Sequence, residues 1–255
     1  MGEVLTINSG ATVNTSVPHF LGWNATNNDL VINGGTLNIG ADFYANSVTM
    51  TGGLITGGPN DGIRNTFGNF IIKSNAAATP AIYDVNFESI SGDRWVFDVA
   101  DGAASNDFIM NGQIPSVFIP VDKLGPGTLQ MNGDMLHTQE TYIQEGTFLL
   151  NGNLNTGNNI HVGNVSGQTA TLQINSGSVT RGQVLMGENG GSGHTSLEGG
   201  TLRTNAVSME GASTFNWGAG EFTMATANAN ASNGMVDFGE VGNAGPSVRE
   251  GSIIN

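Results

Sequence analysis

The sequence contains no cysteine and has few charged residues. Among its 255 residues none is Cys, and only 11% are Asp, Glu, Lys or Arg, whereas soluble domains typically have about 25%. Without cysteine the fold cannot depend on disulfides, and no thiol can act as a nucleophile. No apolar stretch approaches the ~20 residues of a membrane-spanning helix. We therefore expect a fold held by packing and hydrogen bonds, with no segment that inserts into a membrane.

Basic residues are especially scarce and are scattered along the chain. Seven Lys and Arg residues stand against 21 Asp and Glu, which gives a net charge of −14. Nucleic-acid binding requires a concentrated positive surface, and attraction to an anionic membrane requires the same. We therefore expect no nucleic-acid partner and no association with anionic membranes.

Small residues and regularly spaced apolar residues make up most of the chain. It contains 39 Gly, and 38% of it is hydrophobic. Disordered chains combine low hydrophobicity with high charge density, so the composition favours a packed core. Gly, Asn and Thr interrupt every window in which a helical apolar spacing could develop, whereas alternation with a period of two is widespread. The sequence therefore predicts an all-β fold.

One short phrase occurs twice and points to an architecture. "GTLQMNG" covers 127–133, and "GTFLLNG" begins 19 residues later and covers 146–152. A related skeleton, an apolar residue with Gly three positions on and an aliphatic residue two beyond that, has five copies: Ile32/Gly35/Leu37, Met50/Gly53/Ile55, Leu149/Gly152/Leu154, Ile174/Gly177/Val179 and Leu197/Gly200/Leu202.

Neighbouring copies advance by 18 to 25 residues, which suits one coil of a β-solenoid. In such a coil alternate strand residues point inward. We therefore expect Leu129 and Met131 to stack on Phe148 and Leu150 in the core.

Asparagine recurs at the expected corners between strands. Asn33, Asn132, Asn151 and Asn175 each follow an apolar residue and precede Gly or Ser. They can stack as a ladder of side-chain amides, or they can be solvated turn residues; the sequence leaves both interpretations open.

The repeat pattern loosens in two segments of an otherwise continuous solenoid. We expect a single elongated domain over 1–255, with irregular coils or an excursion over 58–93 and a loop-rich segment over 225–247. The final residues, "GSIIN", read as half a strand with nothing after it to cover the last coil. An uncovered coil exposes backbone groups that pair with another chain. We therefore expect self-association through the solenoid ends, or a chain that is a fragment of a larger protein.

Residues 123–152 resemble the autotransporter-associated β-strand repeat of bacterial surface proteins. The matching positions are Lys123, Gly125, Gly127, Thr128, Leu129, Gly133, Thr141, Ile143, Gly146 and Thr147, while Met135, His137 and Gln139 replace the usual Asn, Tyr and Gly. The resemblance implies a right-handed parallel β-helix in a secreted or surface-displayed bacterial protein.

Parallel β-helices also include polysaccharide lyases and hydrolases, so an enzyme is the main alternative. The sequence has no adjacent Asp-Asp, no His flanked by Gly on both sides and no Arg-Ile-Lys triplet, and no nucleotide-binding or zinc-protease motif. His137, His161 and His194 have no motif around them, and solvent-exposed histidine is the favoured interpretation. We predict no catalytic residue and no bound cofactor.

The best local set of acids is Asp98, Asp101 and Asp107. Carboxylate oxygens are suitable calcium ligands, but this spacing matches neither an EF-hand loop nor a Gly-rich calcium repeat. Calcium ligands and solvated turn acids are both open interpretations, and the spacing favours the second.

The predicted function is structural. We expect a non-enzymatic protein of the bacterial cell surface or extracellular space, acting as a rigid stalk, an adhesin passenger or a self-assembling filament or surface-layer unit. The alternative is a β-helix that binds or cleaves glycans, with surface glycans as partners.

Overall fold

The computed structural model describes residues 3–17, 28–58, 61–64, 68–87, 93–115, 118–155, 158–224 and 236–237. Within these residues the chain is built almost entirely of short parallel strands. One short 3-10 helix, η1 (Glu188–Gly190), lies in a turn. None of the described residues belongs to a helix with the length and apolar character needed to cross a bilayer.

The first sheet has 13 strands in the described part of the chain. Its main path runs through β1 (Val4–Asn8), β3 (Asp29–Asn33), β6 (Ser47–Met50), β9 (Phe70–Ser74), β12 (Trp95–Val99), β14 (Val121–Leu124), β16 (Thr141–Ile143), β19 (Ile160–Val162), β21 (Ser178–Met186), β23 (Thr201–Met209) and β25 (Glu221–Met224). Off this path, β18 (Leu154–Asn155) pairs with β21, and β26 (Val236–Asp237) pairs with β23.

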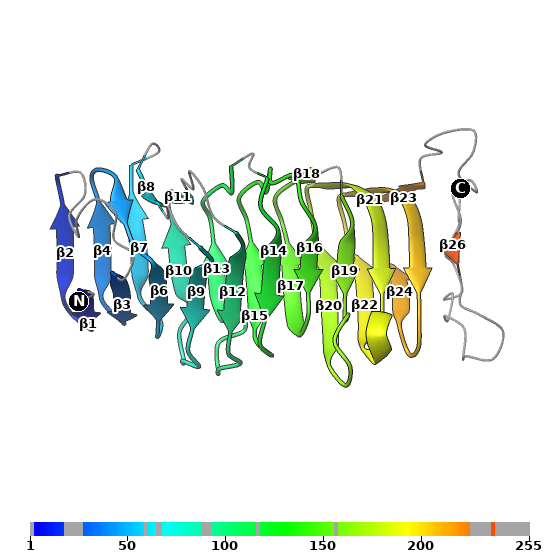
Figure 1. The fold of residues 1–255 in the computed structure, drawn as a ribbon, viewed down its shortest axis with the longest axis horizontal. Coiled ribbons are helices and arrows are strands. Elements are labelled where there is room, and N and C mark those ends of the chain that lie inside the picture. Colours follow the sequence, from blue (N-terminus) through cyan, green and yellow to red (C-terminus); the bar gives the residue numbers. More distant parts are fainter. Residues whose placement is uncertain are drawn as a thin grey trace.

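The second sheet has ten described strands, and a third sheet has three. The second follows β2 (Thr12–Thr15), β4 (Thr36–Ile39), β7 (Leu54–Gly57), β10 (Ala81–Asp84), β13 (Phe108–Met110), β15 (Thr128–Met131), β17 (Gly146–Leu150), β20 (Thr169–Ile174), β22 (Ser192–Leu197) and β24 (Thr214–Trp217). The third contains β11 (Asn86–Phe87), β8 (Gly62–Arg64) and β5 (Phe43–Tyr44). The chain passes repeatedly from the first sheet to the second and back, and each coil stacks on the one before it (Figure 1). The predicted all-β parallel β-solenoid is confirmed.

The two copies of the Gly-Thr phrase lie on each other as predicted. β15 and β17 pair in register, with Leu129 opposite Phe148 and Met131 opposite Leu150. All four side chains are buried in the central core. Because side chains of a strand alternate between its two faces, each rung contributes every second residue to this core. The period-two pattern therefore accounts directly for the apolar interior.

The five-copy skeleton marks two different corners of the solenoid. In its first two copies it joins the first sheet to the second, as from β3 to β4, whereas in the later copies it leads out of the second sheet, as from β20 into β21. The copy assigned to Leu149 is out of phase by one residue. Leu150 pairs with Ile174, whereas Leu149 pairs with Gln173 on the outer face. A corner shorter by one residue in this coil explains the shift, because Leu150 and Leu154 are four residues apart while their partners Ile174 and Val179 are five apart.

The segment 58–93 is more regular in its described parts than its composition predicts. β9 and β10 take their places in the first and second sheets, and β8 and β11 pair with each other in the third. Its large residues fill the core. The Phe87 ring stacks on Tyr83 with centroids 4.6 Å apart and meets Phe70 edge-on at 5.5 Å. In this segment aromatic side chains thus take the core positions that aliphatic residues occupy in the regular repeats. Of the segment 225–247, all but Val236–Asp237 lies outside the described residues.

An amide ladder forms at one corner of the stack. Asn151 Nδ2 donates to Asn132 Oδ1, and Asn132 Nδ2 donates to Asn111 Oδ1, each at 2.7 Å. The amide ladder is therefore confirmed for Asn132 and Asn151. Asn33 donates to Asn8 at a different corner, at 3.2 Å. Asn175 accepts from Gln173 within its own rung, at 2.8 Å.

Candidate functional site

The three acids predicted as possible calcium ligands do not share a site. Asp107 is buried and uses both oxygens on backbone groups, because Oδ1 accepts from Gly102 N and Oδ2 from Thr128 N, each at 2.8 Å. Asp98 Oδ2 lies 4.0 Å from Lys73 Nζ, and Asp101 is exposed. Among the described residues no three His, Cys, Asp or Glu side chains are grouped so that they could hold a metal ion. Asp107 therefore has a structural role in joining two rungs.

Lys123 is a fully buried cation inside the solenoid. In β14 it points inward, in line with Phe97 on one side and Ile143 on the other. Its Nζ donates to three backbone carbonyl oxygens: Leu124 O at 3.0 Å, Gly125 O at 2.6 Å and Glu145 O at 2.9 Å. Burial lowers the pKa of Lys123 to about 8, against the opposing effect of nearby carboxylates, Glu145 first. Because Glu145 belongs to the next rung, the ammonium group ties two corners together.

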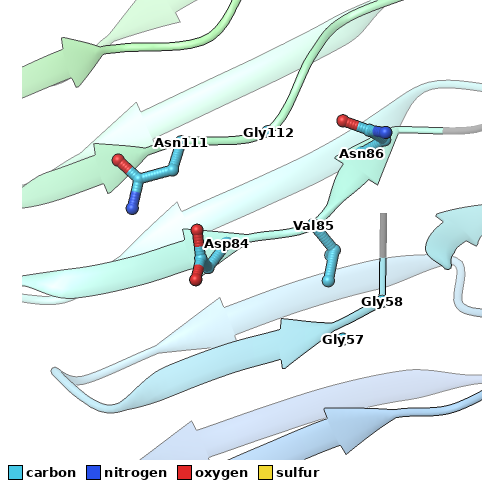
Figure 2. Close-up of a pocket in the computed structure, with 7 residues that line it drawn as sticks. All are labelled: Gly57, Gly58, Asp84, Val85, Asn86, Asn111 and Gly112. Carbon is cyan, nitrogen blue, oxygen red and sulfur yellow. The ribbon is translucent and has the colours of Figure 1, made fainter. Parts of the chain in front are cut away.

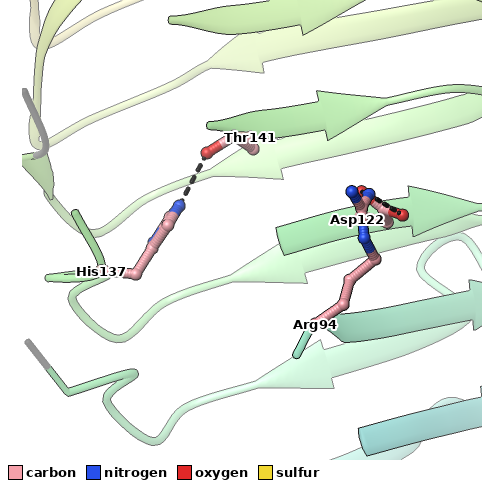
Figure 3. A network of polar contacts seen from close by, with 4 residues as sticks. All are labelled: Arg94, Asp122, His137 and Thr141. Atoms are coloured by element: carbon pink, nitrogen blue, oxygen red, sulfur yellow. Dashed lines mark hydrogen bonds and ion pairs between the residues drawn. The ribbon is translucent and has the colours of Figure 1, made fainter. Parts of the chain in front are cut away.

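His137 is buried, so the expectation of a solvent-exposed histidine is wrong at this position. Its side chain points inward two residues after the buried Met135, and its Nε2 lies 2.9 Å from Thr141 Oγ1 (Figure 3). The alternation of inward and outward residues continues through this turn, which carries the imidazole into the interior. His194 instead lies on the outer side of β22, where its Nδ1 is 2.8 Å from Thr214 Oγ1.

The outer face of the first sheet brings together a row of charged and aromatic side chains. Register places Asp122 of β14 beside Tyr142 of β16, and Tyr142 beside His161 of β19. Two further side chains reach this line from just before β12 and from η1. We call the following five residues the first-sheet row: Arg94, Asp122, Tyr142, His161 and Glu188.

Each member of the first-sheet row contacts the next. Arg94 Nη1 donates to both oxygens of Asp122, at 2.5 and 2.6 Å (Figure 3), and the guanidinium carbon lies 5.3 Å from the centre of the Tyr142 ring. The Tyr142 and His161 rings stack with centroids 4.6 Å apart and an angle of 16° between their planes. His161 Nδ1 lies 2.5 Å from Glu188 Oε2. The five side chains thus form one continuous set of contacts across successive rungs.

Burial and charge act against each other in this row. Burial raises the pKa of Asp122, and the hydrogen bond from Arg94 lowers it by less. The hydrogen bond to Asp122 raises the pKa of Arg94. Burial also raises the pKa of the Tyr142 phenol, with a further contribution from Glu140. A phenol with a raised pKa stays protonated at neutral pH, so the row presents Tyr142 as a neutral hydroxyl group.

Of the first-sheet row, His161 was considered from its sequence as a candidate site residue, whereas its partners were not. Tyr142 precedes His161 by 19 residues, the same step that separates the two Gly-Thr phrases. Applying that step to polar positions would have paired these two rings. Arg94 and Glu188 lie outside the strands, and no spacing in the sequence places them beside the row.

A shallow polar pocket lies beside the ends of β10 and β13. It has a volume of about 310 Å³ and is lined by Gly57, Gly58, Asp84, Val85, Asn86, Asn111 and Gly112 (Figure 2). The two amide side chains already have structural partners, because Asn86 Oδ1 accepts from Gln113 N and Asn111 Oδ1 accepts from Asn132 Nδ2. The pocket adds one carboxylate, Asp84, and so offers fewer functional groups than the first-sheet row.

Comparison of the chain with family models, with curated proteins and with solved structures finds no match.

Proposed function

We propose that this chain is a rigid, non-enzymatic segment of a bacterial cell-surface or extracellular protein, serving as a stalk or adhesin passenger. The observation that supports the proposal is the continuity of the stack. Two parallel sheets run side by side through the described chain, so that each inner rung is hydrogen-bonded to the rungs on both sides (Figure 1). A repeat structure in which each unit contacts its neighbours resists bending because any bend must break these contacts.

Additional polar contacts between rungs support the same role. The Lys123 ammonium and the Asp107 carboxylate each bind backbone groups of neighbouring rungs, and the amide ladder links three successive rungs. Buried polar groups that are fully hydrogen-bonded specify one arrangement of the chain. A surface segment that keeps a distant domain away from the cell requires such a fixed shape.

Self-association through the solenoid ends is part of the proposal. Among the described residues, β1 pairs only with β3, and β2 only with β4, while β24 pairs only with β22. An edge strand presents unpaired backbone donors and acceptors to another chain. Because all the paired strands are parallel, a second copy that stacks end to end continues both sheets and forms an open filament.

Small-angle X-ray scattering over a concentration series tests the proposal. We expect the scattering of a stiff rod with a constant cross-section and with a length that grows in steps as the protein concentration rises. A compact particle would contradict the rod, and a monomer at every concentration would contradict self-association. Antibody labelling of intact cells of the source organism tests the location, since a cytoplasmic protein would stay unlabelled until the cells are lysed.

A further inference from the structure

We propose that the first-sheet row is a binding site for a neutral oligosaccharide. The inference builds on the stalk proposed above, to which it adds a contact surface, and it names the class of ligand. The row is the place in the described structure where an arginine, a tyrosine, a histidine and two carboxylates contact one another on an outer face. The outer positions next to it are aliphatic: Val96 precedes Asp122 in register, and Leu185 follows His161.

The row follows the axis of the rod. Asp122, Tyr142 and His161 occupy equivalent outward positions on three successive strands, while the residues on either side of Tyr142 and His161 in their strands point into the core. Adjacent strands are ~4.8 Å apart, so the three side chains extend over about 10 Å. A linear ligand chain can therefore lie along the rod and meet several of these groups at once.

The side chains are held in place before any ligand binds. Arg94 is fixed by two bonds to Asp122 and by the face of Tyr142, and His161 is fixed by Tyr142 and Glu188. A site whose groups are already ordered loses less conformational entropy on binding. Side-chain exposure is 36% for Arg94, 28% for Glu188 and 15% for His161, so these three groups remain accessible at the surface. The Asp122 side chain is only 7% exposed and serves to position Arg94.

Hydrogen-bonding capacity remains after these internal contacts. The bonds of Arg94 to Asp122 come from Nη1, whereas a guanidinium group has five N–H donors. The contact of His161 with Glu188 uses Nδ1, and a neutral imidazole has a second nitrogen with the opposite donor or acceptor role. Because ring stacking covers the face between Tyr142 and His161, a ligand meets the edges and polar atoms of these rings. Such a surface suits hydroxyl groups, which both donate and accept.

Charge selects the neutral class of saccharide. Within the row the positive Arg94 is already paired with Asp122, and His161 faces the carboxylate of Glu188. The whole chain has a net charge of −14, which repels polyanions such as polyuronates. A ligand rich in hydroxyl groups and without charge avoids this repulsion and retains the hydrogen bonds.

The proposal is tested by calorimetric titration of the intact chain with neutral linear oligosaccharides of glucose, mannose and xylose, and with an oligouronate as the acidic comparison. We expect at least one neutral series to bind, with affinity rising with ligand length, and the oligouronate to bind more weakly. Arg94→Ala and His161→Ala are expected to weaken binding about tenfold each, which corresponds to about 1.4 kcal/mol. His194→Ala is the matched control, because His194 also packs on an outer strand face but on the second sheet.

Several outcomes would overturn the proposal. These are no binding of any neutral oligosaccharide, binding of the oligouronate alone, equal loss of binding in the His194→Ala control, or the release of new reducing ends, which would make the row a catalytic site. Scattering of the same samples separates this result from the stalk proposal. A stiff rod that binds no saccharide would refute only the binding site. The Tyr142→Phe variant keeps the stacked ring, so a loss of binding in this variant would not be caused by misfolding.

Discussion

At the scale of single residues, Lys123 is the least expected feature of this protein. A lysine occupies a core position between Phe97 and Ile143, where the rest of the solenoid places apolar side chains. Its ammonium group meets three carbonyl oxygens of the backbone. Burial of a charge is costly unless hydrogen bonds compensate for it. The corner is therefore stabilised by the hydrogen bonds and destabilised by the desolvation of the same group.

The pH dependence of stability reports the net balance of these two effects. The pKa of Lys123 is lowered from an ordinary value of 10.5 to about 8. Between these pH values the unfolded chain binds more protons at this site than the folded chain, so the free energy of unfolding rises with pH. Between these two pH values the unfolding free energy of the unsubstituted protein should rise by about 3 kcal/mol relative to that of Lys123→Met. Urea unfolding at a series of pH values measures the difference.

Lys73→Met is the matched control for this experiment, because the Lys73 side chain is 49% exposed. An unfolding free energy of the unsubstituted protein that stays constant or falls relative to that of Lys123→Met as the pH rises would contradict the assignment. So would the same pH dependence in both lysine variants.

At the scale of elements, corners decide how closely the rungs can stack. Gly177 is the last residue of the turn from β20 to β21 and has φ +74°, and a Cβ built there would lie 2.1 Å from Gly152 O of the preceding rung. Likewise, a Cβ built on Gly152 would lie 2.2 Å from Gly133 O of the rung before it. Side chains at these corners would push neighbouring rungs apart, so the sheets can pair only with glycine there.

Gly177→Ala and Gly167→Ala distinguish close stacking from backbone conformation. Gly167 has φ +76°, almost the same as Gly177, but a Cβ there meets nothing within 4 Å. Both substitutions incur about 1–2 kcal/mol for a left-handed conformation, and only Gly177→Ala also forces a clash with backbone. We expect Gly177→Ala to lower the unfolding free energy by about 4 kcal/mol or more. Gly167→Ala should lower it by only about 1–2 kcal/mol, the cost of the left-handed conformation. Equal urea midpoints for the two variants would show that the corner is not crowded.

Much of the element structure can be predicted from the sequence, and the reasons are local. Alternation with a period of two reports which residues face the core, and it places Leu129 on Phe148 correctly. The register of strands that follow corners of variable length is harder to predict from the sequence. One residue fewer between Leu150 and Leu154 is enough to shift the repeat skeleton onto Leu149. The first-sheet row is still harder to predict, because outward positions have no apolar pattern and because Arg94 and Glu188 approach the row from turns.

At the scale of the whole molecule, the central claim is that successive rungs stack in register along one axis. One outward column of the second sheet contains Thr36, Leu54, Ile82, Ile109, Gln130, Leu149, Gln173, Ser196 and Asn216, each paired with the next. Distances along this column should therefore increase by one strand spacing for each rung. The absence of cysteine from the chain makes it possible to introduce pairs of cysteines as the only labelling sites.

The most direct test is a set of electron-spin distance measurements between nitroxide labels on such cysteine pairs. With one label at Asn216 and the other at Gln130 or Thr36, four and eight rungs away in register, the account predicts distances of about 19 and about 38 Å. Narrow distributions that grow in proportion to the number of rungs would support the stacked solenoid. Distances that do not increase with rung number would contradict it.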